Sequence, residues 1–232
     1  MSSSRSLGTV LVTGGASGLG AAVVAAVREA GGRPIVLDLH VSALDGVDAH
    51  AIDVSDTRAT EELVARLATE YGGLDAVVTA AGIDRPAPLE QISGTDWERI
   101  VMVNLFGTAA VVRAALPALF ESHGRVVTIA SSLALRALGD ATAYCASKFG
   151  VLGFSRSLAA ETKGRLGVTT VIPAGMNTRF FEGRQEQYKP GADAQLVDAA
   201  EVAEAIVFAL TRPRGVELRE LVICPEEEPS WP

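Results

Sequence analysis

Short, mostly uninterrupted apolar runs alternate along this 232-residue chain with longer stretches whose apolar positions recur at helical spacing. The short runs predict strands at Thr9–Thr13, Pro34–Asp38, His50–Asp53, Ala76–Ala80, Arg125–Ala130, Val168–Ile172 and Glu220–Ile223. The longer stretches predict helices at Gly18–Ala30, Ala59–Tyr71, Trp97–Phe120, Thr142–Lys163 and Ala199–Ala209. Because the strand runs are continuous rather than alternating, they are typical of parallel strands covered on both faces. The pattern therefore predicts a doubly wound α/β sheet of about seven strands.

The alternation runs without a repeat, a low-complexity segment or a linker, and the length of the chain suits one large domain. We therefore expect a single domain over residues 1–232. One segment, Arg179–Asp198, carries few periodic signals and is predicted to be an irregular insertion. Irregular segments of this kind often carry specificity in enzymes.

Composition narrows the classes of partner. The formal net charge of −8 argues against nucleic acid as a partner, because a nucleic-acid site needs a basic surface. The two cysteines and three histidines lack metal-ligand spacing, so no metal site is expected. Residues 1–6 are polar without an apolar signal region, and no run approaches eighteen apolar residues. We expect a soluble, cytoplasmic protein with no membrane partner.

Three glycines, Gly14, Gly18 and Gly20, fall between a predicted strand and a predicted helix. Glycines in that context allow a sharp turn and the close approach of phosphates, which the N-terminus of the following helix attracts. A Walker A phosphate loop is excluded, because Ala21 and Ala22 stand where Lys-Ser/Thr would be needed. The remaining interpretations are a dinucleotide site and a purely structural turn.

Asp38 ends the second predicted strand, eighteen residues beyond Gly20. An acidic side chain there accepts hydrogen bonds from the adenosine ribose and repels a 2′-phosphate. No basic residue lies in the glycine turn, and Leu39 and His40 follow Asp38. This pattern favours NAD over NADP, with a solvated strand-end aspartate as the alternative interpretation.

Tyr144 and Lys148 lie four residues apart on a predicted helix, thirteen residues beyond Ser131. Residues at this spacing share one helix face, so both side chains are expected to point into the same space. A nearby ammonium group stabilises phenolate, which predicts a lowered pKa for Tyr144. A phenol tuned in this way suits the proton transfer of alcohol–carbonyl interconversion. The alternative is an ordinary helix-face pair whose lysine reaches out to solvent.

With these motifs in order, the chain resembles the classical short-chain dehydrogenase/reductase family over nearly its whole length. Thr13–Gly20 fits the family's TGxxxGxG, and Ala80-Ala81-Gly82 stands where the family reads NNAG or NAAG. The other positions that match family motifs are Asp53-Val54, Asn104, Ser131 and the turn from Pro173 to Thr178. The chain departs from the family pattern at Thr79, Ala80 and Ala174.

The resemblance implies a single Rossmann-type domain. Residues 7–130 would form mainly its dinucleotide-binding half, and residues 131–232 would supply the catalytic helix, a substrate loop at 179–198 and a C-terminal strand. It also implies a set of contacts to NAD. The expected cofactor-binding residues are Gly14, Ser17, Gly18, Leu19, Gly20, Asp38, Asp53, Val54, Ala80, Ala81, Gly82, Tyr144, Lys148, Pro173 and Thr178.

The resemblance further implies a catalytic set of Asn104, Ser131, Tyr144 and Lys148. Tyr144 would exchange the proton, and Ser131 would hydrogen-bond the substrate oxygen. Lys148 would lower the Tyr144 pKa and bind the nicotinamide ribose, and Asn104 would extend a proton path through water. Ser132 adjoins Ser131 and is its rival, but the thirteen-residue spacing to Tyr144 favours Ser131.

The expected activity is NAD-dependent interconversion of a secondary alcohol and a ketone. An NADP-linked carbonyl or ketoacyl-type reductase and a non-catalytic NAD-binding sensor or scaffold remain alternatives. Five apolar residues are candidates either for a substrate wall or for lid packing: Leu133, Leu135, Leu138, Phe180 and Phe181. Three arginines, Arg136, Arg179 and Arg184, are candidates either for a substrate clamp or for solvated surface charge.

The resemblance also implies a homo-oligomer, a dimer or a tetramer, formed through the two long helices. Small residues would allow those helices to approach closely. The candidates on the second helix are Gly150, Gly153, Ala159 and Ala160.

Overall fold

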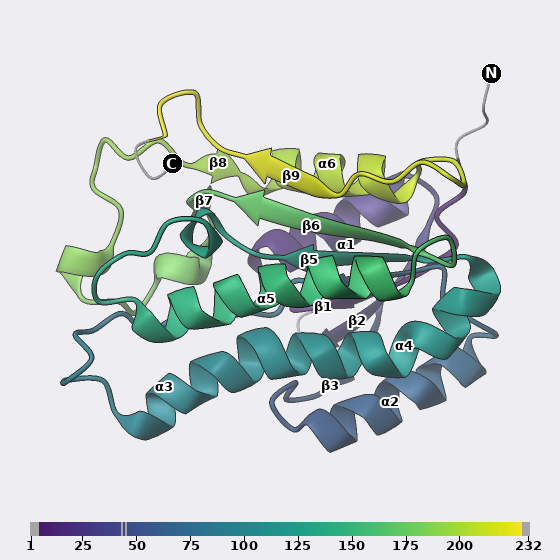
Figure 1. Cartoon of the computed structure of the whole chain (residues 1–232), viewed down its shortest axis with the longest axis horizontal. Coiled ribbons are helices and arrows are strands. Elements are labelled where there is room, and N and C mark those ends of the chain that lie inside the picture. The colour runs from purple at the N-terminus through teal and green to yellow at the C-terminus, as the bar shows by residue number, and fades with distance from the viewer. Residues whose placement is uncertain (1–4, 43, 45, 229–232) are drawn as a thin grey trace.

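The computed structural model describes residues 5–42, 44 and 46–228. Its main sheet is wholly parallel, with the strand order β3-β2-β1-β4-β5-β6-β9 (Figure 1). The strands are β1 (Thr9–Thr13), β2 (Arg33–Asp38), β3 (Asp48–Ala51), β4 (Ala76–Thr79), β5 (Arg125–Ile129), β6 (Gly167–Pro173) and β9 (Glu220–Ile223). The chain winds outward from β1 to β3 and then returns to β4. The strand order thus reverses between β1 and β4, which is where doubly wound sheets bind ligands.

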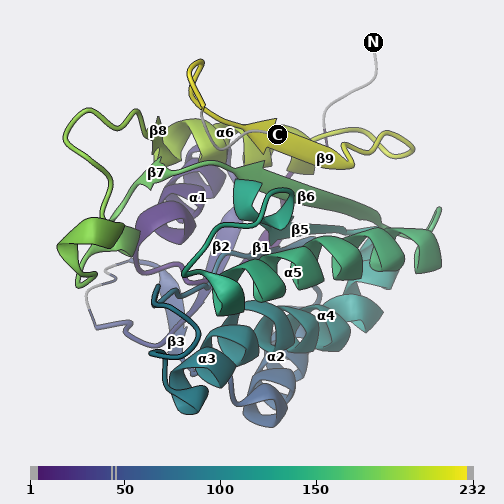
Figure 2. The same cartoon turned by 60° about the vertical axis from the view of Figure 1, so that its left-hand side comes forward.

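Helices cover both faces of the sheet (Figures 1 and 2). One face carries α1 (Gly18–Glu29) and α6 (Ala199–Leu210), and the other carries α2 (Thr57–Glu70), α4 (Thr108–Ser122) and α5 (Thr142–Glu161). The predicted doubly wound fold is therefore confirmed. The first four residues of the polar N-terminal segment, for which no signal region is expected, lie outside the described residues.

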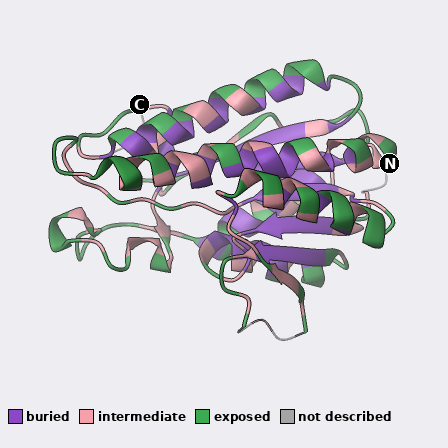
Figure 3. Ribbon diagram, turned by 90° about the horizontal axis from the view of Figure 1, so that it is seen from below, coloured by how far each residue is buried: buried purple, intermediate pink, exposed green. Residues whose placement is uncertain are grey.

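Successive residues of the central strands serve opposite cores, because side chains alternate across a sheet. Val10 and Val12 of β1 pack with α1 and α6, whereas Leu11 between them packs with α2 and α4. All three are fully buried. Figure 3 shows the strands as a buried layer between helices whose outer faces are exposed. Burial on both sides explains why the strand runs in the sequence are continuous rather than alternating.

A single long helix crosses the second face of the sheet. It comprises α3 (Gly94–Val101), a π-helical segment (Met102–Gly107) and α4, and the side chain of Ser93 caps it by accepting from Asp96 N. The helix has 29 residues and contains an 18-residue window with a mean hydropathy of 1.7, so by length and composition alone it could cross a membrane. Half of this 18-residue window is buried inside the protein, as in the core helix of a globular domain.

The irregular segment predicted at 179–198 is held at both ends by a second, two-stranded parallel sheet. β7 (Met176–Asn177) pairs with β8 (Val197–Asp198), and this pairing closes the intervening residues into a loop. Within the loop, short 3₁₀ turns form at Arg179–Phe181 and Glu186–Tyr188. Figure 1 places the loop beyond the ends of the main strands, on the left of the molecule.

The small residues of α5 do not all face outward as expected. A Cβ atom at Gly150 would lie 2.7 Å from the Leu105 side chain, and Ala159 is buried in the core beneath α5. Of the four small residues proposed on this helix, only Gly153 and Ala160 are exposed. Ala159 is therefore enclosed by its own chain and is not available to a partner helix, and the close approach of helices from two chains stays a prediction.

Candidate active site

A cavity of about 700 Å³ opens along the carboxyl ends of the main strands. Its lining includes every predicted cofactor-binding residue, together with Ser131. The sequence motifs therefore converge on one site although they lie far apart in the chain. Of the predicted site residues, only Asn104 does not line this cavity. Within the described ranges, His, Cys, Asp and Glu side chains form no group of three that could hold a metal.

The glycine turn lies close against the loop that follows β4. Gly14 has φ +70°, and a Cβ atom there would lie 2.8 Å from the backbone of Ala81. Ala81 N donates to Thr13 Oγ1 at 3.1 Å, which fixes this contact. Only glycine combines the left-handed backbone with so close an approach. The turn therefore has a structural role and also lines the cavity.

The N-terminus of α1 faces the same cavity. No side chain caps it at Ser17, and no acidic residue lies in its first turn. Gly18 has φ +52°, and the Thr178 side chain would lie 3.5 Å from a Cβ atom placed there. The uncapped N–H groups and the positive end of the helix dipole suit an anionic group. These features fit the pyrophosphate of a dinucleotide.

Asp38 lines the cavity and holds the glycine turn. Its carboxylate accepts from Ala16 N at 2.9 Å and from His40 N at 3.1 Å. A carboxylate has about four acceptor positions, so it can still receive ribose hydroxyls. The alternative of a merely solvated strand-end residue does not describe this position. The bond to Ala16 is a role that the sequence analysis missed.

Asp53 lies at the same end of the cavity and is oriented by Arg99. The Arg99 Nη2 atom donates to Asp53 Oδ2 at 2.7 Å, and the Ser55 hydroxyl donates to Asp53 Oδ1 at 2.7 Å. Burial raises the pKa of Asp53, but these hydrogen bonds outweigh it and hold the pKa below its usual value. Arg99 also lines the cavity and was not anticipated from the sequence.

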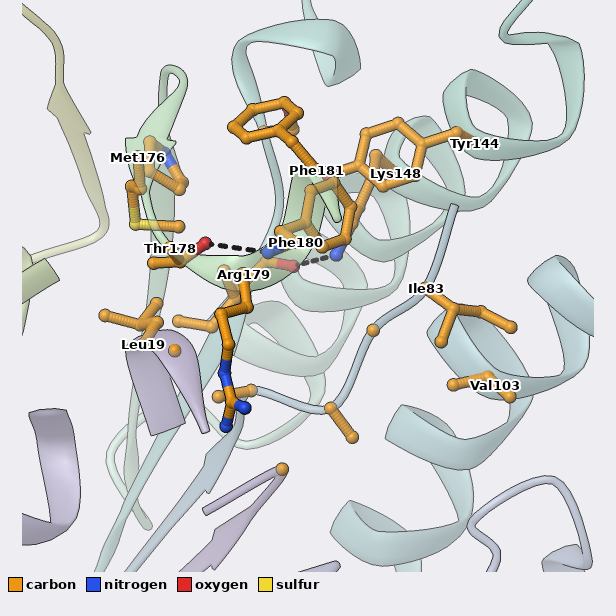
Figure 4. Close-up of a pocket in the computed structure, with 18 of the residues that line it drawn as sticks. Leu19, Ile83, Val103, Tyr144, Lys148, Met176, Thr178, Arg179, Phe180 and Phe181 are labelled. Atoms are coloured by element: carbon orange, nitrogen blue, oxygen red, sulfur yellow. Dashed lines mark hydrogen bonds between the residues drawn. The ribbon is translucent and has the colours of Figure 1, made fainter. Parts of the chain in front are cut away.

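Tyr144 and Ser131 meet at the opposite end of the cavity. The Ser131 hydroxyl lies close enough to Tyr144 to lower the pKa of its phenol, and Ser131 Oγ accepts from Leu133 N at 3.1 Å. The Tyr144 ring contacts Phe180, with 5.8 Å between centroids. Figure 4 shows Tyr144, Lys148, Phe180 and Phe181 gathered at this end, with Arg179 extending away from them. Ser131 is thus the serine that acts on the Tyr144 pKa, and Ser132 lines the same cavity.

Lys148 is buried behind Tyr144. It is 5% exposed, and its Nζ atom donates to Ile129 O at 2.9 Å. The same atom lies 5.5 Å from the centroid of the Tyr144 ring. Burial lowers the pKa of Lys148 to about 8, against a smaller opposing effect of Asp84. A lysine that reaches out to solvent is therefore excluded.

The pKa of Tyr144 moves in the direction opposite to the prediction. Burial raises it well above its usual value, and the hydrogen bond from Ser131 offsets only part of that rise. Nearby charges act in both directions, since Asp84 raises the pKa and Arg184 lowers it. The predicted lowering is wrong in this structure, because burial outweighs the basic groups and Lys148 approaches the ring rather than bonding the hydroxyl.

Asn104 lies in the π-helical segment and ties two elements together. Its Nδ2 atom donates to Ile83 O at 2.9 Å and to Ser147 Oγ at 3.0 Å, and its Oδ1 atom accepts from Ile83 N at 2.8 Å. The residue is 1% exposed. These bonds fix the loop after β4 against α5. Its predicted role in a proton path through water stays a prediction.

Substitution of Lys148 by methionine is expected to stabilise the fold. The lowered pKa means that the folded state disfavours the charge, a penalty present in full below about pH 8 and lost as pH rises towards 10.5. We expect Lys148→Met to raise the free energy of unfolding at pH 7 by about 2 kcal/mol. This value is the relieved charge penalty less about 1 kcal/mol for the lost hydrogen bond to Ile129 O. Urea unfolding at pH 7 and pH 10 measures this difference, which should shrink at pH 10.

Lys163→Met provides the control, because Lys163 is exposed just beyond α5. That substitution should change the free energy of unfolding by less than about 0.5 kcal/mol at either pH. A Lys148→Met variant less stable than the parent at both pH values would contradict the assigned penalty.

The substrate end of the cavity differs in part from expectation. Leu133, Leu138, Phe180 and Phe181 line it, but Leu135 packs instead on the buried cluster around Ala134 and Val151. Two of the three candidate arginines, Arg179 and Arg184, line the cavity, whereas Arg136 does not. The Arg184 side chain is only 11% exposed and is paired with Asp84, so it is not a solvated surface charge.

Comparisons with known proteins agree with this geometry. A family model described as short chain dehydrogenase matches residues 8–189. D-threitol dehydrogenase of Mycolicibacterium smegmatis (strain ATCC 700084 / mc(2)155) is 36% identical over 219 residues, covering 85% of this chain and 84% of that protein.

Solved structures show the same fold. The alcohol dehydrogenase of the archaeon Thermococcus sibiricus, complexed with 5-hydroxy-NADP, superposes with a TM-score of 0.84 at 23% identity, covering 93% of this chain and 95% of that one. The ligand-free aldohexose dehydrogenase of Thermoplasma acidophilum gives a TM-score of 0.84 at 26% identity, covering 95% and 96%.

The fold and the cavity define a class of dinucleotide-binding α/β protein with a serine–tyrosine pair and a buried lysine at one end of its site. The chain belongs to the short-chain dehydrogenase family. It is therefore an oxidoreductase that uses a nicotinamide cofactor, and the resemblance seen in the sequence is confirmed.

Proposed function

We propose that the protein is an NAD-dependent oxidoreductase that interconverts a secondary alcohol and a ketone. The observation that carries this proposal is the placement of Ser131 and Tyr144 together at one end of a cavity whose other end is lined by Asp38. Lys148 is buried behind this pair. A proton-transfer group and a dinucleotide cradle thus share one site.

The nicotinamide ring supplies the hydride chemistry, and the chain supplies orientation and proton transfer. Tyr144 holds the proton that the substrate oxygen exchanges, because it lines the cavity beside Ser131 and its raised pKa keeps it protonated at neutral pH. Ser131 is a second hydrogen-bond partner for the same oxygen and stabilises charge developing on it. Lys148 brings a positive charge next to the Tyr144 ring and would hold a ribose hydroxyl.

Asn104 acts in this proposal by holding the loop after β4 in place. Gly82 in that loop lies between Asn104 and Lys148, because a Cβ atom there would be 3.4 Å from Asn104 Oδ1 and 3.6 Å from Lys148 Nζ. A water molecule between these groups would link Lys148 to solvent, as the family resemblance implies. The loop contact alone makes Asn104 a positioning residue.

The names of related proteins support an alcohol substrate. The relative from Mycolicibacterium smegmatis is named for D-threitol, which is a polyol. The Thermococcus sibiricus structure is of an alcohol dehydrogenase and contains 5-hydroxy-NADP, but at 23% identity it supports the fold alone. The preference for NAD therefore rests on Asp38 rather than on relatives.

Removal of the Asp38 charge is expected to change cofactor preference. We expect the wild-type protein to bind NADH at least about 100-fold more tightly than NADPH, because the carboxylate repels a 2′-phosphate. Asp38→Asn keeps an acceptor for Ala16 N but loses the charge, so the preference should fall about tenfold or more, mainly through tighter NADPH binding. Nicotinamide fluorescence titrations measure both dissociation constants.

Asp38→Ala separates the charge from the hydrogen bond. It loses the contact to Ala16 as well, so it should weaken the binding of both cofactors. Tighter binding of NADPH than of NADH by the wild-type protein would overturn the NAD assignment and favour an NADP-linked reductase.

The reaction itself is tested with a panel of secondary alcohols and NAD, followed by the absorbance of reduced nicotinamide. Turnover of at least one alcohol supports the proposal. Tight NADH binding without turnover of any alcohol or ketone would contradict it and favour a protein that binds NAD without catalysis.

A homo-oligomer, a dimer or a tetramer, is part of the same proposal. Phe106 and Phe149 are 51% and 44% exposed on the long helix and α5, the face expected to pair. Large exposed aromatic side chains of this kind are enriched at protein interfaces. Light scattering at micromolar concentration and neutral pH should give the mass of two or four chains. The mass of one chain would contradict the prediction.

A further inference from the structure

A buried ion pair joins the loop after β4 to the substrate loop at the cavity. Arg184 Nη2 donates to Asp84 Oδ2 at 3.0 Å, and the two side chains are 11% and 6% exposed. Asp84 Oδ1 also accepts from Arg85 N at 2.8 Å. Arg184 lines the cavity, whereas Asp84 lies behind it. Burying two charges is costly, and such pairs are retained in some proteins because they confer specificity.

Aromatic rings fix the guanidinium of Arg184 in place. Its Cζ atom lies 4.8 Å from the centroids of both Phe180 and Phe181, and those rings meet edge to face. Phe180 in turn contacts Tyr144, so one phenyl ring separates the guanidinium from the proton-transfer residue. Tyr188, which also lines the cavity, bonds Asp140 at 3.0 Å and ties the loop at a second point.

Arg184 lines the cavity, and a guanidinium carries five N–H donors. Its Nε atom is fully enclosed and makes no hydrogen bond to any described residue, so a ligand would accept from the terminal Nη atoms. Asp84 accepts from Nη2 in the hydrogen bond described above, and a group with several donors can serve a ligand as well. The charge of Arg184 is already balanced by Asp84. A neutral acceptor such as a hydroxyl therefore suits this position better than a carboxylate.

We propose that Arg184, held by Asp84, is a specificity-determining residue that recognises a second hydroxyl of a neutral polyhydroxylated substrate. Arg184 donates a hydrogen bond to a substrate hydroxyl beyond the reacting carbon, while Phe180 and Phe181 cover the carbon chain. Asp84 is a positioning residue that fixes the guanidinium and cancels its charge. This inference rests on the proposed oxidation of a secondary alcohol and names the class of alcohol.

Four-carbon alcohols with increasing numbers of hydroxyls test the proposal on one carbon frame. The panel is 2-butanol, 2,3-butanediol and threitol, with 3-hydroxybutanoate as the anionic member. For the wild-type protein with NAD, kcat/KM should rise with hydroxyl number and should be lowest for the anion. A preference for 2-butanol or for 3-hydroxybutanoate would overturn the proposal.

Two substitutions separate recognition from loop closure. Arg184→Met keeps an unbranched apolar stem but loses the guanidinium and its donors, so kcat/KM for threitol should fall about tenfold or more while that for 2-butanol changes less than about threefold. Asp84→Asn leaves Arg184 with net charge, so activity should shift from threitol towards 3-hydroxybutanoate. Equal losses on threitol and 2-butanol in both variants would show a purely structural pair and overturn the proposal.

Arg85→Met is the matched control, because Arg85 follows Asp84 in the same loop but pairs with Asp96 and does not line the cavity. Its substrate profile should match that of the wild-type protein. NADH binding should be unchanged in all three variants.

A second measurement keeps this proposal separate from the proposed reaction. Threitol and 2-butanol are titrated into the protein–NADH complex, and the change in nicotinamide fluorescence is followed. If no alcohol is oxidised, the proposed reaction fails, yet threitol binding that weakens in Arg184→Met and not in Arg85→Met still supports hydroxyl recognition. Absence of threitol binding to the wild-type complex overturns it.

Discussion

Replacement of Tyr144 by phenylalanine is expected to lower kcat for alcohol oxidation by about 1,000-fold, within the range that general acid–base catalysis contributes. The substitution removes one oxygen atom and keeps the ring that contacts Phe180 and lies beside Lys148. The cavity should therefore keep its shape, and the dissociation constant for NADH should change less than about threefold. Steady-state kinetics and NADH titration on one preparation measure both effects.

Tyr71→Phe is the matched control, since Tyr71 lies at the end of α2 and its hydroxyl bonds Asp48 away from the cavity. It should retain wild-type kcat. A loss of only a few-fold in Tyr144→Phe would exclude Tyr144 as the proton-transfer group, even though it lies beside Ser131 in the cavity.

The raised pKa of Tyr144 also gives the two directions of reaction opposite pH dependence. Because burial favours the neutral phenol, Tyr144 is protonated at neutral pH and ready to donate during ketone reduction. Oxidation needs the phenolate, so its kcat/KM should rise with pH through the neutral range. In Tyr144→Phe this rise should disappear.

The sheet could be predicted from the sequence because its strands are buried on both faces. Each becomes a continuous apolar run, and the predicted and observed bounds of β1 and β9 agree at both ends. The convergence of the expected cofactor-binding residues on one cavity was equally predictable. These residues lie at the carboxyl ends of the strands, so placing the strands also places the residues that follow them.

The long helix shows what the apolar pattern could not reveal. The sequence predicted its start at Trp97, but the helix begins at Gly94, because Ser93 caps it and the first turn is polar. The π-helical segment that holds Asn104 leaves no sign in apolar spacing. Its extra residue per turn is recognised only from backbone geometry.

Pairs of site residues that lie far apart in the chain could not be predicted from the sequence either. Asp84 and Arg184 are one hundred residues apart, and no local pattern links them. The error in the Tyr144 pKa has the same origin. Helical spacing placed Lys148 nearby, but the degree of burial depends on a substrate loop whose path a single sequence does not indicate.

Gly20→Ala is expected to have the largest effect on the fold among single-methyl substitutions in the glycine turn. A Cβ atom at Gly20 would lie 2.0 Å from Gly14 O and 3.0 Å from Gly15 Cα, both backbone atoms. The added methyl group can be accommodated only if the turn moves away from α1. We expect the free energy of unfolding to fall by about 3 kcal/mol, as for overpacked cores, in urea unfolding experiments.

The same displacement should weaken cofactor binding at least about tenfold, because the uncapped N–H groups at the start of α1 must stay aligned with Gly14 and Gly18 to hold a pyrophosphate. Gly94→Ala is the control, since a Cβ atom there meets nothing within 4 Å and α3 tolerates alanine. That variant should be at least as stable as the parent and bind NADH equally well. Wild-type NADH affinity in Gly20→Ala would mean that the glycine turn does not carry the cofactor, and the dinucleotide site would have to be sought elsewhere in the cavity.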